Sequence, residues 1–137
     1  MSANGLHNAM NEYRSAGMEG VVEEASPHLL VHMLLQGAMD KIAAAKGHMQ
    51  AGDVALKGEN VSKAISIIES LRASLDREVG GELAANLNDL YDYMGRRLLE
   101  ANARNEIAML DEVAGLLGEI KSGWDAIPPE HREPQAR

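Results

Sequence analysis

Residues 80 to 105 carry the longest continuous amphipathic pattern in the chain, GGELAANLNDLYDYMGRRLLEANARN. Apolar residues recur in it at steps of three and four, which places them on one side of a helix. Charged residues such as Asp89, Arg96 and Glu100 take the opposite side. A helix of this kind buries its apolar side against other elements, so the fold must supply neighbours for it. The apolar side consists of Leu83, Leu87, Leu90, Tyr91, Met94, Leu98 and Ala101.

Three other segments have a helical period and are expected to be those neighbours. The first begins at Ser26-Pro27, a capping serine followed by proline at the first helical position, and runs to about residue 49. After a loop that extends to residue 60, the second runs to residue 79. Gly80-Gly81 then reverses the chain. The third runs from about residue 106 to Pro128-Pro129, which ends it.

The side chains that these three segments turn inward are mostly aliphatic. Together with residues 80 to 105 they predict an all-α fold, an antiparallel four-helix bundle over residues 27 to 127. The predicted inward residues are Val31, Leu34, Leu35, Ala38, Ile42, Ala45 and Met49; Val61, Ala64, Ile65, Ile68, Leu71 and Leu75, with Ile67 at the edge; and Leu110, Val113, Leu117, Ile120 and Trp124.

The two ends of the chain are expected to lie outside the bundle. Residues 1 to 26 form an arm without a sustained period, although Leu6, Met10 and Tyr13 fall at steps of four and three. This arm either frays as an ordinary terminus or docks on the bundle as a short extra helix. Residues 128 to 137 are polar and contain proline, so we expect a disordered tail.

Composition and charge exclude several classes of function. The chain has 13 Lys and Arg against 21 Asp and Glu, a net charge of −8, so no basic stripe is available for nucleic acid. It has no cysteine and therefore no disulfide, thiolate nucleophile or Cys-based zinc site. No apolar run is long enough to span a bilayer and no signal-peptide pattern is present, so we expect a cytoplasmic protein without membrane insertion.

No residue pattern marks an active site, a metal or a cofactor. Glu-x-x-His, the motif of di-iron bundles, does not occur. His28 and His32 lie four residues apart but lack the glutamate of HExxH, so we expect two partly exposed histidines rather than metal ligands. Gly80-Gly81 follows a helix and not a strand, which does not fit a phosphate-binding loop. The sequence therefore favours a binding module over an enzyme.

Two surfaces are candidates for binding. On the first predicted helix Leu29, Met33, Gly37 and Ala44 form a second, small-to-apolar side roughly opposite the core side. Apolar residues on both sides of a helix imply two burials, and either the N-terminal arm or another protein can provide the second. On the helix of residues 80 to 105, Tyr93 falls at the edge of the apolar side beside Asn86 and Arg97. Tyr93 is either a buried ring with one edge exposed to solvent or part of a recognition surface.

Several runs of the sequence resemble the flagellin export chaperone family, FliS. The resemblance covers residues 13 to 124 in order and without large gaps. Its most specific parts are Ala25-Ser26-Pro27, Gly58-Glu59, Gly80-Gly81-Glu82 and Asn86-Leu87 followed by Leu90-Tyr91-Asp92-Tyr93-Met94. The further runs are ASPHLLVHMLLQGA, LKGENVSKAISIIESL, LDREVGGELAANLNDLYDYMGRRLLEAN and EVAGLL, and then Trp124.

The resemblance implies a cytosolic helical bundle that is not an enzyme. Such a chaperone holds the disordered C-terminal segment of flagellin (FliC), prevents premature polymerisation and delivers the subunit to the export gate protein FlhA. Tyr13 matches the tyrosine of an N-terminal arm thought to cover the client groove of the empty chaperone. The alternative is a structural bundle that self-associates and has no flagellin client. The oligomeric state is open, because an exposed groove can pair two copies as a homodimer in the absence of client. The predicted client-binding residues are Tyr13, Leu29, Met33, Gly37, Ala44, Asn86, Tyr91, Tyr93 and Arg97.

Overall fold

The computed structural model describes residues 26 to 131, and within them the chain forms four long α-helices and one 3₁₀ turn. No strand occurs in that range, so the predicted all-α fold is confirmed. Residues 1 to 25 and 132 to 137, and with them the predicted arm and most of the predicted tail, lie outside the described residues. The elements are α2 (Pro27–Ala51), α3 (Val54–Ala73), α4 (Arg77–Arg104), α5 (Ile107–Asp125) and η3 (Pro129–His131).

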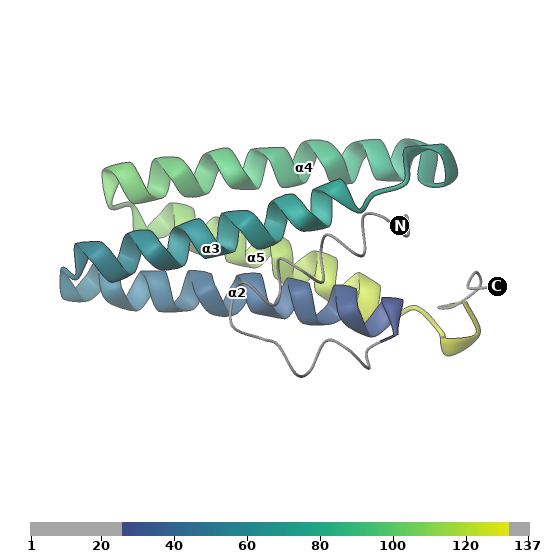
Figure 1. Ribbon diagram of the computed structural model, residues 1–137, viewed down its shortest axis with the longest axis horizontal. Coiled ribbons are helices and arrows are strands. Elements are labelled where there is room, and N and C mark those ends of the chain that lie inside the picture. Colours follow the sequence, from purple (N-terminus) through teal and green to yellow (C-terminus); the bar gives the residue numbers. More distant parts are fainter. Residues whose placement is uncertain (1–25, 132–137) are drawn as a thin grey trace.

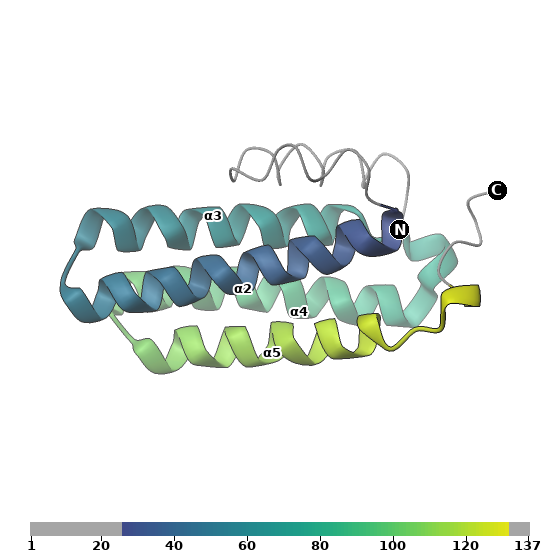
Figure 2. The same cartoon turned by 90° about the horizontal axis from the view of Figure 1, so that it is seen from below.

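The four helices form an antiparallel bundle in which each one packs against the next (Figures 1 and 2). α2 packs on α3 and α5, and α4 packs on the same two helices from the opposite side. α2 and α4 are therefore diagonal to one another and run in the same direction. Their N-terminal ends lie at one end of the bundle, together with the C-terminal end of α5.

The start of α2 follows the prediction. The hydroxyl of Ser26 accepts a hydrogen bond of 3.1 Å from the amide of Leu29, and Pro27 occupies the first helical position. The first backbone amides of a helix have no hydrogen-bond partner within the helix. The serine hydroxyl provides a partner for one of these amides, and proline has no amide hydrogen that would need one.

The connection between α2 and α3 is much shorter than predicted. Gly52 has φ +78° and ends α2, and the carboxylate of Asp53 already accepts from the amide of Leu56 at 3.1 Å. A glycine in the left-handed region followed at once by a capping aspartate needs no longer loop. The expectation of a loop up to residue 60 is therefore wrong, because α3 begins at Val54.

The reversal between α3 and α4 is also displaced from the predicted position. The hydroxyl of Ser74 donates to the carbonyl of Leu71 at 2.8 Å, and the Asp76 carboxylate accepts from the amides of Glu78 and Val79. These residues end one helix and begin the next, so the turn predicted at Gly80-Gly81 is wrong. Gly81 instead makes a kink inside α4 with φ 54° and ψ −128°, a conformation open to glycine alone.

The core is aliphatic apart from Tyr91, as predicted, and most of the predicted inward residues are buried. Two exceptions are informative. Ile67 is fully buried rather than at an edge, and Leu83 is 67% exposed rather than inward. Leu83 is exposed because the first turns of α4 project beyond the ends of α3 and α5 (Figure 1). The fully buried large side chains are Tyr91, Leu34, Leu35, Ile42, Ile67, Ile68, Leu71, Met94, Leu98, Leu110 and Leu117.

Candidate functional site

The predicted binding residues of α2 differ widely in exposure. Leu29 is 46% exposed, Met33 and Ala44 are half-buried, and Gly37 is buried. Met33 packs against the core on its inner edge. A partner that approaches this side of α2 therefore meets Leu29 first, whereas contact with Gly37 requires close approach along the helix.

The predicted binding residues of α4 divide in the same way. Asn86 is exposed, Tyr93 and Arg97 are half-buried, and Tyr91 is 1% exposed. Burial raises the pKa of Tyr91 to about 12, because the phenolate would lose its hydration. A partner can reach Tyr91 only if neighbouring helices separate.

The structure does not bring these residues together in one site. The α2 group and the α4 group lie on diagonal helices, so the core separates them. Tyr13 lies outside the described residues. A single partner that contacts both groups would have to extend around the bundle rather than occupy one pocket.

A charged network connects Tyr93 and Arg97 to α5 through Glu112. The Tyr93 hydroxyl donates to Glu112 Oε2 at 2.5 Å, and Arg97 Nε donates to Glu112 Oε1 at 2.7 Å. Glu112 thus accepts from both residues of α4, and these two bonds hold its pKa below the usual range. The hydrogen bond to Glu112 raises the pKa of Tyr93, since the phenol must keep its proton to donate it. Sequence reasoning missed Glu112, because one carboxylate among 21 acidic residues gives no signal of its partner.

Glu112 should make the free energy of unfolding depend on pH in the acid range. Its folded pKa lies below the unfolded value, so its contribution is present above the unfolded pKa of about 4 and is lost as pH falls through the folded pKa. We expect Glu112→Gln to be less stable than the parent protein at pH 7 and to lose less stability on acidification. Urea unfolding at a series of pH values from 7 to about 3 measures both effects. Equal acid dependence of the two proteins would contradict this role of Glu112.

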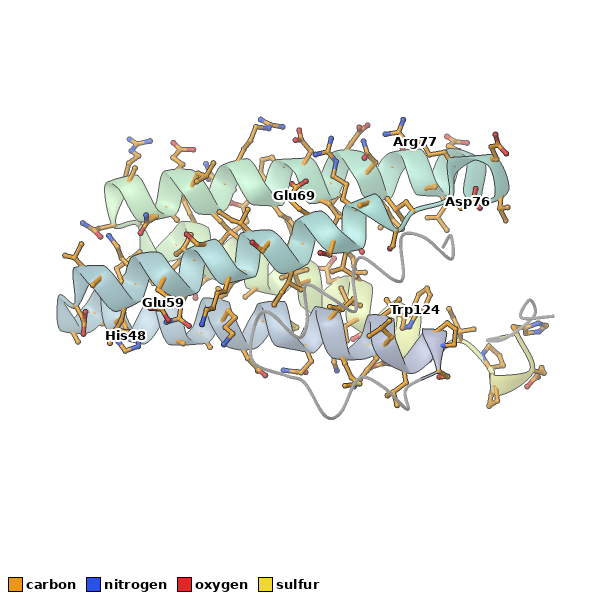
Figure 3. The ribbon with its side chains drawn as sticks, viewed as in Figure 1. His48, Glu59, Glu69, Asp76, Arg77 and Trp124 are labelled. Carbon is orange, nitrogen blue, oxygen red and sulfur yellow. The ribbon has the colours of Figure 1, made fainter. Side chains whose placement is uncertain are left out.

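A reciprocal contact joins the first turn of α2 to the last turn of α5. His28 Nε2 donates to the carbonyl of Trp124 at 2.8 Å, and Trp124 Nε1 donates to the carbonyl of His28 at 2.9 Å. The two rings stack, with centroids 4.9 Å apart and planes 11° apart. Trp124 therefore holds α5 against the start of α2 (Figure 3).

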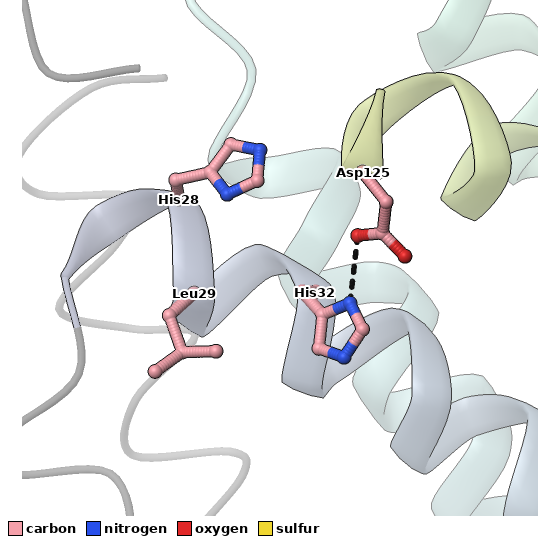
Figure 4. Close-up of a pocket in the computed structure, with 4 residues that line it drawn as sticks. All are labelled: His28, Leu29, His32 and Asp125. Atoms are coloured by element: carbon pink, nitrogen blue, oxygen red, sulfur yellow. Dashed lines mark hydrogen bonds and ion pairs between the residues drawn. The ribbon is translucent and has the colours of Figure 1, made fainter. Parts of the chain in front are cut away.

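One turn further along α2, His32 faces the same end of α5. Its Nδ1 donates to Asp125 Oδ1 at 2.7 Å, and this hydrogen bond is the main reason why the pKa of Asp125 lies below its usual range. His28, Leu29, His32 and Asp125 line a shallow pocket of about 210 Å³ (Figure 4). We call it the α2–α5 pocket. Between residues 26 and 131, no three histidine or carboxylate side chains gather in a way that would hold a metal ion.

None of the described helices has both the length and the apolar character needed to cross a membrane.

Comparison with known proteins gives consistent matches along nearly the whole chain. A family model described as "Flagellar protein FliS" matches residues 9–131. The chain is 49% identical over 119 residues to the flagellar secretion chaperone FliSB of Pseudomonas aeruginosa, covering 87% of this chain and 94% of the relative. It is 49% identical over 119 residues to the flagellar secretion chaperone FliS of Salmonella typhimurium, covering 86% and 88%. With the flagellar secretion chaperone FliS of Bacillus subtilis the identity is 36% over 120 residues, covering 87% and 89%.

Proposed function

Because this chain belongs to the FliS family of flagellar proteins, we propose that it is a cytoplasmic flagellar secretion chaperone whose client is flagellin (FliC). It binds the disordered C-terminal segment of flagellin, prevents premature polymerisation and delivers the subunit to the export gate protein FlhA. In this function it is a binding protein and not an enzyme.

The observation that carries the proposal is the extent of the family match. Residues 9–131 include all four described helices, so the likeness extends over the whole bundle and not only one motif. Relatives that are named flagellar secretion chaperones share about half of the aligned residues. A sequence match over all four helices supports a shared kind of client.

The geometry supports an extended contact rather than a pocket. A disordered segment that folds on binding typically buries about 1,000 to 3,000 Å² and spends roughly 2 to 5 kcal/mol on ordering. No pocket of about 210 Å³ can supply such an area. We therefore assign the start of the client contact to the exposed side of α2 at Leu29 and Met33, with the α4 residues Asn86, Tyr93 and Arg97 as a second region.

Calorimetric titration with a peptide of the last ~50 residues of flagellin tests this proposal, since that length can supply the extended interface. We expect one-to-one binding with a negative heat-capacity change. Leu29→Asp and Met33→Asp should each weaken binding by at least about tenfold, because they place a charge in an apolar contact. Gly37→Asp is not used, since a carboxylate at this buried position would disturb folding as well as binding.

Leu99→Asp is the matched control, because Leu99 is a leucine of α4 that is 60% exposed and lies away from the predicted contact. It should bind the peptide as tightly as the parent protein does. Parent-like affinity of both α2 variants would overturn the placement of the contact. Failure of the folded parent protein to bind flagellin would overturn the choice of client.

The alternative is a structural bundle that self-associates without a client, and the exposed leucines and valines favour it. Sedimentation over a concentration series, with and without flagellin, distinguishes the two functions. A chaperone forms a complex with flagellin at the expense of any self-association, whereas a structural bundle keeps the same distribution of species.

A further inference from the structure

The side of the bundle between α4 and α5 carries one acidic residue that contacts two predicted client-binding residues at once. Glu112 accepts from the Tyr93 hydroxyl through Oε2 and from Arg97 Nε through Oε1, at 2.5 and 2.7 Å. Both oxygens of one carboxylate are therefore engaged, each by a different side chain of α4. Tyr93 and Arg97 are four residues apart, so they lie on the same side of α4 in adjacent turns.

A second, longer contact restrains the guanidinium of Arg97 within α4 itself. Its Nη1 donates to Glu100 Oε1 at 3.4 Å, and Glu100 Oε2 accepts from Arg104 Nη1 at 2.6 Å. The contacts thus run from Tyr93 through Glu112, Arg97 and Glu100 to Arg104. Two guanidiniums balance two carboxylates in this network, so it carries no net charge.

The stability that the contact between Glu112 and Arg97 adds is small. Their side chains are 37% and 32% exposed, and ion pairs at such exposure contribute little to the free energy of unfolding. An arginine side chain and a tyrosine ring that could otherwise change rotamer are nevertheless held in one orientation. The main effect of Glu112 is therefore to order two side chains at the surface of the bundle.

Tyr93 and Arg97 both keep groups with which a partner can interact. Tyr93 is half-buried, so part of its ring faces solvent. Arg97 uses Nε and Nη1 in the contacts above, and its Nη2 has no hydrogen-bond partner within residues 26 to 131. Nη2 can therefore donate to an acceptor of a partner, such as a main-chain carbonyl. Tyrosine and arginine are also the residue types enriched where interfaces gain most of their affinity.

Side chains that are ordered before binding make binding tighter. Immobilising a long side chain on association costs free energy, and a side chain already held in its bound orientation avoids that cost. For one such side chain the difference corresponds to about threefold to tenfold in the dissociation constant.

We propose that Glu112 is a positioning residue for the client: it does not touch flagellin, but it holds the Tyr93 ring and the Arg97 guanidinium in the orientation in which flagellin binds them. This inference rests on the proposed function, since it assigns how one part of the client contact is prepared. It adds a residue of α5 to a contact that otherwise consists of residues from α2 and α4.

Calorimetric titration of the full chain with the flagellin peptide at pH 7 tests this role. Glu112→Gln replaces one of the two acceptor oxygens by a donor, so we expect the dissociation constant to rise by about threefold to tenfold. Glu112→Asp keeps the charge but is shorter by one methylene group, so it cannot reach both partners and should weaken binding to a similar extent. Circular dichroism confirms that the variants are folded.

Glu119→Gln is the matched control. Glu119 is an exposed carboxylate about two turns further along α5, and it has no hydrogen bond or ion pair with the residues from 26 to 131. Its replacement removes the same charge from the same helix, so this variant should bind the peptide as the parent does. Equal weakening by Glu119→Gln and Glu112→Gln would show a general effect of charge and would overturn the positioning role.

A mutant cycle shows whether Glu112 acts through its two partners. In a Tyr93→Phe/Arg97→Gln background the further change Glu112→Gln should leave the dissociation constant unchanged, because neither of the hydrogen bonds to be held remains. If Glu112→Gln weakened binding as much in this background as in the parent, Glu112 would act independently of Tyr93 and Arg97, contrary to the proposal. Parent-like affinity of Glu112→Gln in the unaltered background would also overturn it.

A measurement on the free protein separates this proposal from the choice of client. In the parent the Arg97 Nε–H donates to a carboxylate, so its NMR signal should exchange slowly with water. The exchange should be faster in Glu112→Gln, because an amide oxygen holds a guanidinium less strongly than a carboxylate does. Fast exchange in the parent would overturn the positioning role even if flagellin binds. Slow exchange in a parent protein that does not bind flagellin would instead overturn the client, and the role of Glu112 toward it.

Discussion

Replacement of Tyr91 by alanine is expected to lower the free energy of unfolding by roughly 3 to 5 kcal/mol, the range for loss of a large buried aromatic ring. The side chain is 1% exposed and packs among the aliphatic residues of the core. Because neighbouring helices are close-packed and cannot collapse fully onto the space, the cost includes a cavity as well as lost burial. Replacement of Tyr91 should therefore act on the stability of the fold and not directly on the binding of a partner.

Urea unfolding followed by far-UV circular dichroism measures this effect, with Tyr93→Ala as the matched control. Tyr93 lies two residues away on α4 but is half-buried, and its hydroxyl bonds to Glu112. Its loss should cost much less than the loss of Tyr91, because it removes one hydrogen bond from a partly exposed side chain and leaves no cavity in the core. An equal loss of stability in the two variants would contradict the burial of Tyr91 in the core and the partial exposure of Tyr93.

The sequence predicted helix interiors better than helix ends, for a physical reason. Apolar residues at steps of three and four report directly on burial, so the core side of α2 and the buried residues of α5 follow from the pattern. The position of a helix end depends on which of several nearby residues caps the helix. Asp53 and Asp76 both cap helices, and neither stands out in a chain with 21 acidic residues, whereas Gly80-Gly81 is a strong turn signal that the structure uses for a kink.

Leu83 was misplaced because periodicity does not reveal how far a neighbouring helix extends. Its position on the apolar side of α4 is correct, but α5 ends at Asp125 and leaves that part of α4 uncovered. Helix length depends on the capping residues of another segment, so exposure at the end of a bundle needs three-dimensional information. The same holds for the α2–α5 pocket, whose residues come from opposite ends of the described chain.

The candidate binding residues of α2 and of α4 were predicted from different features of the sequence. The α2 residues came from apolar character on a second side, and their partial exposure depends on which neighbours cover that side. Asn86, Tyr93 and Arg97 of α4 came from their position at the edge of the apolar side of that helix. The motif that carries the family resemblance contains both Tyr91 and Tyr93, and a shared motif contains core and surface residues alike. Tyr91 and Tyr93 belong to one motif, yet one is buried and the other bonds to Glu112. Only the structure separates them.

Replacement of Trp124 by alanine is the second change with a large expected effect, a loss of roughly 2 to 4 kcal/mol in the free energy of unfolding. Trp124 is half-buried, so the loss is smaller than for a fully buried indole. The variant also loses the ring stacking with His28 and the hydrogen bond from Nε1 to the His28 carbonyl. Since Trp124 is the single tryptophan of the chain, unfolding must be followed by circular dichroism rather than by fluorescence.

Trp124→Phe separates most of the packing from hydrogen bonding, because it keeps a smaller ring against His28 and removes the donor. It should lose about 1 kcal/mol from the hydrogen bond and much less than the alanine variant in total. Combining Trp124→Ala with His28→Ala completes a double-mutant cycle. The two losses should not add fully, because both changes remove the same ring stacking, although each removes only the hydrogen bond that its own ring donates to a backbone carbonyl. Simple additivity would mean that the two rings stabilise the bundle separately and that the contact between α2 and α5 is not a coupled one.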